Sequence, residues 1–155
     1  MTEISTGITD EPLDVAGAIA GASAPGCGGI GVFVGTVRTS AAAPGRDDTP
    51  VVRLQYEAHP SLAADKLGQV ARAASERWDI HRIVAWHRSG ACAIGEPTVV
   101  IACGAAHRSD ALEACHWIID TVKTTVPIWK REVYADGSSW LGAEGAVEEV
   151  PGRTP

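Results

Sequence analysis

Two lysines on either side of a proline are the first feature of the sequence that could do chemistry. Lys123 and Lys130 flank Pro127, where a predicted helix gives way to a predicted strand. A lysine that lies beside other cations and apolar walls loses part of its proton affinity. It can then act as an acid, a base or a nucleophile. The spacing predicts a pocket at this break, within reach of both ammonium groups.

Three further residues are suited to binding an anion. Arg38 ends an apolar strand, beside a stretch over 39–50 that has small and polar residues and no periodicity, typical of a mobile loop. His107 and Arg108 come immediately before a predicted helix. The free backbone N–H groups of a helix start attract phosphate or carboxylate, and a guanidinium can add a bidentate contact. These three residues indicate that the protein also has a site that binds an anion.

Each of these features also has a simpler interpretation. Arg38 could be a surface charge at a strand end, His107 a helix cap, and the lysines solvated, which is the usual state of lysine. A phosphate-ester hydrolase with His107 as its base is another hypothesis, but the sequence offers no nucleophile partner or metal-ligand set for it. The glycine cluster over 26–29 precedes a strand, not a helix, and indicates a turn.

The four cysteines predict free thiols. Cys27, Cys92, Cys103 and Cys115 form no C-x-x-C pair, and the first residues do not resemble a secretory signal, so we expect a cytoplasmic protein. Cys103 and Cys115 lie in apolar patterns and are predicted core residues. Cys103 and His107 have a C-x3-H spacing, but no second ligand pair accompanies them, which argues against structural zinc.

The composition limits the classes of function. The 155 residues are 45% hydrophobic and 21% charged, the balance of one ordinary globular domain. Thirteen Lys and Arg residues against 19 Asp and Glu residues give a net charge of −6, which disfavours sequence-independent nucleic-acid binding. No apolar run approaches the roughly 20 residues of a membrane span. We therefore expect neither nucleic acid nor membrane as a partner.

The elements that must position these residues follow from periodicity and turn signals. Val52, Leu54 and Tyr56 alternate with polar residues, as in a half-buried antiparallel strand. The pattern predicts, in order, strand 3–8, a helix after the start signal at 10–12 that stops near 23–26, strand 29–38, strand 51–58, a helix from Pro60 to Trp78, strand 80–87, a short extended piece between Gly90 and Gly95, strand 98–102, helix 108–124, strand 128–134 and strand 139–141.

The third predicted helix carries the most detailed pattern. Its predicted buried stripe is Ala111, Cys115, Ile118 and Val122, and Asp110 and Glu113 have the spacing of a capping box. Helices and strands do not alternate regularly along the chain. The order therefore predicts an α+β fold with mostly antiparallel strands, not a doubly wound α/β fold.

Taken together, the motifs are similar to those of a known family. From about Asp10 to Trp140 the chain resembles the large, catalytic subunit of molybdopterin synthase, the MoaE family. The resemblance is carried by GTVR, LQYEAHPSLA, HRSGACAIGE, AAHRSDALEACHWIIDTVKTTVPIWKRE and DGSSW, of which the KTxxPIWKRE pattern is the strongest signal.

The resemblance implies a fold and an assembly. The family fold is the α/β-hammerhead, here as a single catalytic-subunit domain over 1–141 followed by a loose tail over 142–155. Two large subunits form a central homodimer. Each binds a small, ubiquitin-like sulfur carrier, the MoaD-like subunit, whose Gly-Gly C-terminus is a thiocarboxylate, so that the complex is a heterotetramer.

The resemblance also implies an activity. Members are sulfurtransferases that convert cyclic pyranopterin monophosphate (precursor Z) into molybdopterin by installing two dithiolene sulfurs, a step of molybdenum cofactor biosynthesis. By motif, Lys123 and Lys130 resemble the catalytic lysines, Arg38, His107 and Arg108 the ligands of the substrate anion and pterin, and Phe33 an aromatic near the pocket. No cofactor or metal is implied.

One alternative within the same family stays open, that of a non-catalytic paralogue that only binds the carrier. The presence of both lysines argues against it. Two positions differ from the family pattern, because Thr39 and a long Ala/Pro-containing stretch follow Arg38, and Ser139 precedes Trp140. We therefore expect that one contact to the phosphate or to the carrier tail is either missing or supplied from elsewhere.

Overall fold

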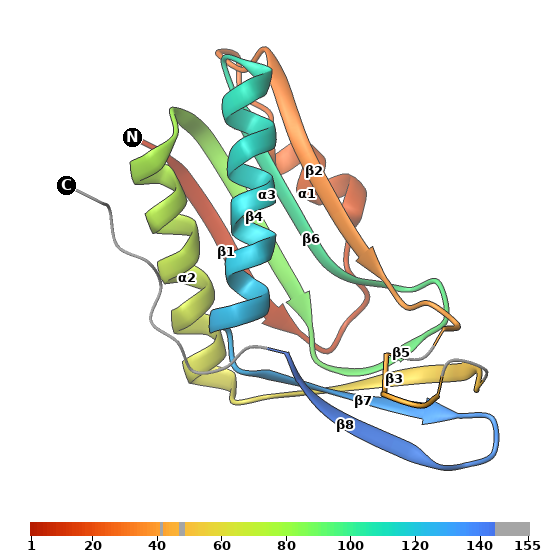
Figure 1. Ribbon diagram of the computed structural model, residues 1–155. Helices are drawn as coiled ribbons and strands as arrows, with labels where there is room; N and C mark the ends of the chain where they lie inside the picture. Colours follow the sequence, from red (N-terminus) through yellow and green to blue (C-terminus); the bar gives the residue numbers. More distant parts are fainter. Residues whose placement is uncertain (41, 47–48, 145–155) are drawn as a thin grey trace.

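The computed structural model describes residues 1–40, 42–46 and 49–144, which form two four-stranded sheets and three helices (Figure 1). The elements are β1 (Glu3–Thr9), α1 (Val15–Ala22), β2 (Gly29–Thr36), β3 (Val51–Ala58), α2 (Pro60–Arg77), β4 (Ile80–Arg88), β5 (Gly90–Ala93), β6 (Pro97–Ala105), α3 (Arg108–Thr125), β7 (Ile128–Tyr134) and β8 (Ser139–Glu144). Their order and type are those that the sequence predicts, and the α+β class is confirmed.

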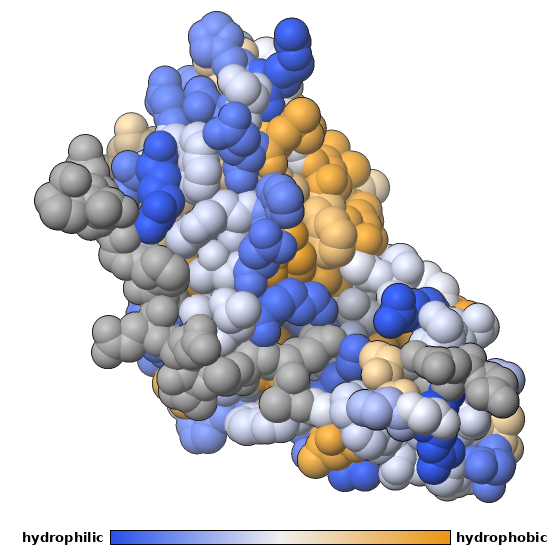
Figure 2. Space-filling model, in the orientation of Figure 1, coloured by the Kyte–Doolittle hydropathy of each residue, from blue (hydrophilic) through white to orange (hydrophobic). Residues whose placement is uncertain are grey.

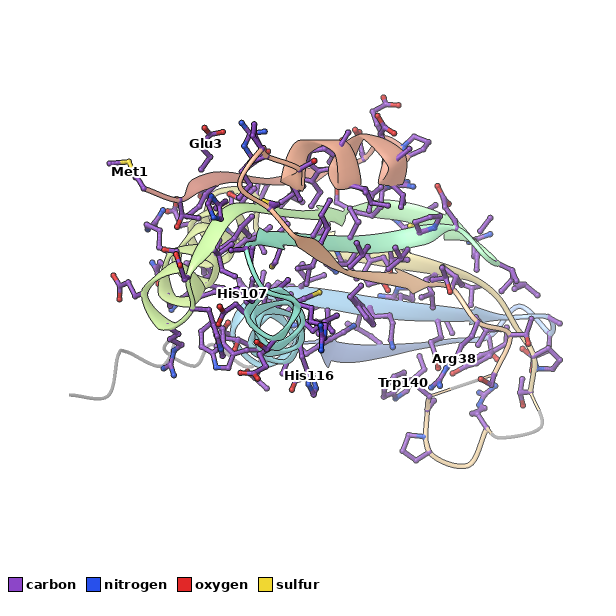
Figure 3. All side chains as sticks on the ribbon, turned by 90° about the horizontal axis from the view of Figure 1, so that it is seen from above. Met1, Glu3, Arg38, His107, His116 and Trp140 are labelled. Carbon is purple, nitrogen blue, oxygen red and sulfur yellow. The ribbon has the colours of Figure 1, made fainter. Side chains whose placement is uncertain are left out.

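The first sheet has the strand order β1-β4-β6-β2 and is covered on both faces. Helices α2 and α3 lie on one face and α1 on the other, as the end-on view in Figure 3 shows. β1 pairs in parallel with β4, whereas the β4–β6 and β6–β2 pairs are antiparallel. Ile101 of β6 is fully buried, as expected for an interior strand between two helical layers.

The α3 helix lies close to the first sheet because β2 carries a glycine beneath it. The predicted stripe of Ala111, Cys115, Ile118 and Val122 is buried, as expected. A Cβ added at Gly31 would lie 2.4 Å from the carbonyl oxygen of Ala111. A side chain at Gly31 would therefore push the helix away from the sheet.

The second sheet has the order β5-β3-β7-β8 with antiparallel pairs throughout. The predicted alternation of β3 is wrong at Val52, because the register shifts between Val51 and Arg53. Val51 and Leu54 are both buried, while Val52 is 44% exposed instead of facing inward with Leu54. A bulge of this kind breaks the two-residue period, so alternation alone could not place Val52.

Arg88 joins the first sheet to the second. It ends β4, is buried, and forms an ion pair with Glu96, the residue just before β6. Its guanidinium also donates to the carbonyl oxygens of Asp10 at 3.1 Å and Ala91 at 3.0 Å, and Ala93 N–H donates to Glu96 at 2.9 Å. One buried cation thus holds β4, β5 and the segment after β1 together.

Several predictions at the ends of elements need correction, among them strand 29–38, because β2 ends at Thr36 and Arg38 lies beyond it. The first helix begins at Val15, because the Asp14 carboxylate caps it by accepting from Gly17 N–H at 2.9 Å, so Pro12 precedes it. The predicted capping box of α3 is wrong, since the N-cap is His107 without a side-chain cap bond, and Glu113 instead accepts from the Trp78 ring N–H. Strand β8 continues to Glu144, so the predicted tail over 142–155 begins too early, and 145–155 lie outside the described residues.

Candidate active site

A pocket of about 370 Å³ opens where the end of α3, the end of β2 and the start of β6 meet the second sheet. In Figure 1, α3 descends along the first sheet toward the crossing strands β3 and β7. The pocket is lined by side chains or backbone of Phe33, Val34, Gly35, Thr36, Arg38, Leu54, Tyr56, Thr98, Val99, Lys123, Lys130 and Glu132. It therefore lies at the predicted helix-to-strand break.

Three cations line this pocket from three different segments. Lys123 lies in the last turn of α3, Lys130 on β7 opposite Tyr56 of β3, and Arg38 two residues beyond the end of β2. The described part of the lining holds a single acid, Glu132. Because the lining carries three positive charges and one negative charge, the pocket has a net positive charge that favours an anion. The sequence prediction that both lysines reach one pocket is confirmed.

The chain turns sharply to bring the two lysines together. Val126 caps α3 by donating its N–H to the Val122 carbonyl at 3.1 Å, and Pro127 cannot continue the helix. β7 then begins at Ile128, which is buried and fixes the strand in the core. A packed helix and a packed strand thus hold the two lysine backbones, while the lysine side chains face the pocket.

Phe33 forms part of the pocket wall next to a glycine. Phe33 is 37% exposed on β2 and lines both this pocket and a neighbouring hollow. A Cβ at Gly35 would lie 2.7 Å from Val99 and 3.4 Å from the Phe33 ring. Gly35 therefore keeps open the space between the Phe33 ring and β6, which any side chain would fill.

Glu132 and Tyr134 are site residues to which the sequence analysis gave no role. Glu132 is 2% exposed, and its carboxylate accepts from Ala42 N–H and Ala43 N–H and from the Tyr134 hydroxyl at 2.9 Å. Burial raises the pKa of Tyr134, and its hydrogen bond to Glu132 raises it further, so the hydroxyl stays a donor. The sequence did carry a signal for Glu132, because it is an acid at an inward-facing position of the strand IWKRE. A buried acid needs hydrogen-bond partners.

His107 and Arg108 do not reach this pocket within one chain. They lie at the start of α3 and are exposed, whereas Lys123 lies in its last turn. Fifteen residues separate Arg108 from Lys123, which corresponds to roughly 22 Å along a helix. Figure 3 shows His107 at the near end of α3, with Arg38 and Trp140 toward another edge of the molecule.

An apolar strip lies between the two ends of α3. Val32, Phe33 and Leu112 are 38%, 37% and 57% exposed, and they surround a hollow of about 440 Å³ that also contacts Ile119. Figure 2 shows hydrophobic surface beside α3, over β2. Exposed apolar side chains gathered around one hollow are suited to contact with another protein surface.

Other kinds of site are not found among the described residues. Over 1–40, 42–46 and 49–144, no group of three or more His, Cys, Asp or Glu side chains is arranged to hold a metal ion. Within the same ranges, no helix is both long and apolar enough to cross a membrane.

The fold and the pocket define an α+β protein with a cation-lined pocket at the junction of two sheets. The chain belongs to the MoaE protein family, whose model matches residues 8–125. That range includes Phe33, Arg38 and Lys123, while Lys130 and Glu132 follow it.

Individual relatives extend this match. The molybdopterin synthase catalytic subunit of Arabidopsis thaliana is 41% identical over 83% of this chain, which spans 62% of that relative's length. The catalytic subunit of Halalkalibacterium halodurans is 36% identical over the whole chain and 96% of its own length. The crystal structure of molybdopterin synthase from Staphylococcus aureus has a TM-score of 0.79 at 30% identity, over 88% of this chain and 95% of that one.

Proposed function

We propose that this protein is the catalytic subunit of a molybdopterin synthase and acts in the cytoplasm. In this proposal it transfers sulfur from the C-terminal thiocarboxylate of a small, MoaD-like carrier to precursor Z, which forms the dithiolene of molybdopterin. The observation that carries the proposal is the convergence of Arg38, Lys123 and Lys130 on one pocket in a member of the MoaE family.

The pocket matches the charge of the proposed substrate. Precursor Z carries a cyclic phosphate, and Arg38 offers a planar guanidinium that can bind two phosphate oxygens at once. Phe33, which is 37% exposed, supplies flat apolar surface suited to a pterin ring, and Tyr56 lines the pocket from β3. We infer that Arg38 binds the phosphate while the aromatic side chains contact the ring.

The lysines are proposed to move protons and stabilise charge. As sulfur adds to a substrate carbon, an oxygen leaves or an enolate-like charge develops, and both need a proton donor or a cation nearby. Lys123 and Lys130 line the pocket from opposite elements and are placed for these two roles. Because the sulfur arrives on the carrier, no cysteine of this chain is required as a nucleophile.

The carrier tail is proposed to enter this same pocket. A C-terminal Gly-Gly segment has no side chains, so it can pass through a narrow opening and bind through its backbone. The terminal thiocarboxylate is an anion, and the three cations of the pocket attract it as well as the phosphate. Substrate and sulfur donor thus meet between the two lysines.

A second copy of the chain is proposed to supply the missing anion ligands. A two-fold axis through the apolar strip of Val32, Phe33 and Leu112 would run two α3 helices antiparallel and bury this strip against itself. The helix start of one copy would then approach the helix end of the other. In this way His107 and Arg108 of each copy would complete the pocket of its partner, in a homodimer that binds two carriers.

Reconstitution tests this function directly. The purified protein is mixed with precursor Z and a carrier bearing the thiocarboxylate, and dithiolene product is measured. We expect product with this carrier and none with the same carrier ending in an ordinary carboxylate. Carrier binding without any product from a folded protein would refute the catalytic proposal and support the carrier-binding paralogue.

A further inference from the structure

A buried carboxylate in a pocket built for anions is unexpected. Glu132 lines the pocket together with Arg38, Lys123 and Lys130, and only 2% of its surface is exposed. A negative charge at this place would repel a phosphate or a thiocarboxylate if it faced the ligand. Its presence therefore calls for a role other than ligand contact.

The hydrogen bonds of Glu132 point to a neighbouring loop. One carboxylate oxygen accepts from Ala42 N–H and Ala43 N–H, both at 3.1 Å, and from the Tyr134 hydroxyl at 2.9 Å. The other oxygen accepts from Ala42 N–H at 2.9 Å. The carboxylate of Glu132 thus binds two backbone amides of the segment after β2, those of Ala42 and Ala43. Hydrogen bonds to a charged group are stronger than those between neutral groups.

A second contact fastens the same segment to the same hairpin. The Arg46 guanidinium lies 4.5 Å from the centre of the Tyr134 ring and donates to the Ser138 hydroxyl at 2.8 Å. Tyr134 therefore contacts both of the side chains that hold the segment: its hydroxyl donates to Glu132, and its ring packs against Arg46. These three side chains tie the segment to β7 and the β7–β8 turn.

Arg38 lies just before the fastened segment, between two residues with fixed backbones. Val37 is buried and exchanges backbone hydrogen bonds with Gly95 and Glu96, while the carbonyl of Thr39 accepts from Val51 N–H at 2.8 Å. The backbone on both sides of Arg38 is therefore held in place, and Arg38 itself lines the pocket. Ala42 and Ala43, the residues that Glu132 binds, follow a few positions later.

We propose that Glu132 is a positioning residue that, with Tyr134, fastens the segment after β2 to β7 and so directs Arg38 into the anion pocket. The effect of Glu132 on substrate is indirect and passes through Arg38. The role assigned to Arg38 rests on the proposed function, whereas the fastening itself does not. Glu132 would accordingly control the affinity for the anionic substrate more than the rate of the chemical step.

Trypsin provides a test of the fastening without any substrate. Arg46 is a trypsin site within the fastened segment, and opening of the segment makes it accessible to the protease. We expect cleavage there to be about tenfold faster in Glu132→Gln. Weakening one hydrogen bond to a charged group raises the population of the opened segment by about this factor. Glu57→Gln, the same change on the exposed face of β3, is the matched control and should cleave like the wild type. Equal cleavage of wild type and Glu132→Gln would overturn the proposal.

Steady-state kinetics then test the link to Arg38. In Glu132→Gln and in Tyr134→Phe, which keeps the carboxylate and the ring, we expect KM for precursor Z to rise severalfold with kcat nearly unchanged. A fall in kcat alone, with KM unchanged, would show that Glu132 acts on the chemistry and would overturn the positioning role. Tyr134→Phe keeps the test decisive if Glu132→Gln fails to fold. Failure of the wild type to make product would refute the function, while the trypsin result still decides the fastening.

Discussion

The two sheets of this protein are stabilised in different ways. The first sheet is covered by helices on both faces, and its contacts are apolar side chains such as Ile101 and Ile118, which are fully buried. The second sheet carries a buried acid, a buried tyrosine and an anchored loop next to the pocket. The comparison indicates that the first sheet supplies stability while the second, with the helix end, supplies chemistry.

This division predicts opposite effects for variants in the two regions. Ile101→Ala removes a fully buried side chain from the first sheet, so we expect the free energy of unfolding to fall by about 3 kcal/mol. Urea denaturation measures this change. Sulfur transfer by the folded fraction should stay close to the wild-type rate. A large loss of transfer at unchanged stability would show that the first sheet is not merely a support.

Lys130→Ala should have the reverse effect. The side chain lines the pocket and is not part of the apolar core, so unfolding by urea should change little. Transfer should fall about 100-fold, the range for loss of one proton-transferring group. Lys66→Ala, a lysine on α2 that does not line the pocket, is the control. If the two variants transfer sulfur equally well, Lys130 has no role in the reaction.

Glu96→Gln tests the link between the two regions. The Ala93 N–H lowers the pKa of Glu96, and Arg88 lowers it further against the effect of burial. A pKa that is lower in the folded state gives stability that is complete above the unfolded pKa and is lost as pH falls through the folded one. We expect Glu96→Gln to be about 2 kcal/mol less stable at pH 7, with the difference shrinking below about pH 4. A difference that grows on acidification would contradict this ion pair.

Cys27→Ala should have the smallest effect of all. Cys27 lies just before β2, at the opposite end of that strand from Arg38, and its thiol contacts the Ala22 carbonyl at 3.8 Å. Since the sulfur comes from the carrier, transfer and stability should both stay near wild type, within about 0.5 kcal/mol for stability. Loss of transfer in the folded variant would mean that a thiol of this chain takes part.

The same contrast explains what the sequence could and could not predict. The order of elements and the buried stripe of α3 follow from periodicity, because apolar burial repeats along a helix or strand. The exposed Val52 follows from a bulge, and the fastening by Glu132 follows from backbone amides 89 and 90 residues away. Neither leaves a local pattern in the sequence.

In the candidate site, the residues near the helix-to-strand turn at Pro127 could be predicted from the sequence. Which of the other site residues would join them in one pocket could be predicted only in part. Lys123 and Lys130 share a pocket because one proline lies between them, a short-range feature. Phe33 and Arg38 join them from β2 and from the residues just beyond its end, which are distant in the sequence. His107 is the N-cap of α3 and Arg108 its first residue, whereas Lys123 lies in its last turn, so the length of the helix keeps them apart within one chain.

Single-turnover sulfur transfer by Lys123→Ala is the most direct test of the central claim, which is that this pocket performs the reaction. The variant is mixed with precursor Z and preformed thiocarboxylated carrier, and dithiolene formation is followed in time beside Lys66→Ala. We predict that Lys123→Ala folds, binds the carrier and forms almost no product, and that Lys123→Arg does not restore it, because arginine keeps the charge but does not release a proton. Transfer by Lys123→Ala at close to the wild-type rate would contradict the catalytic role of this pocket.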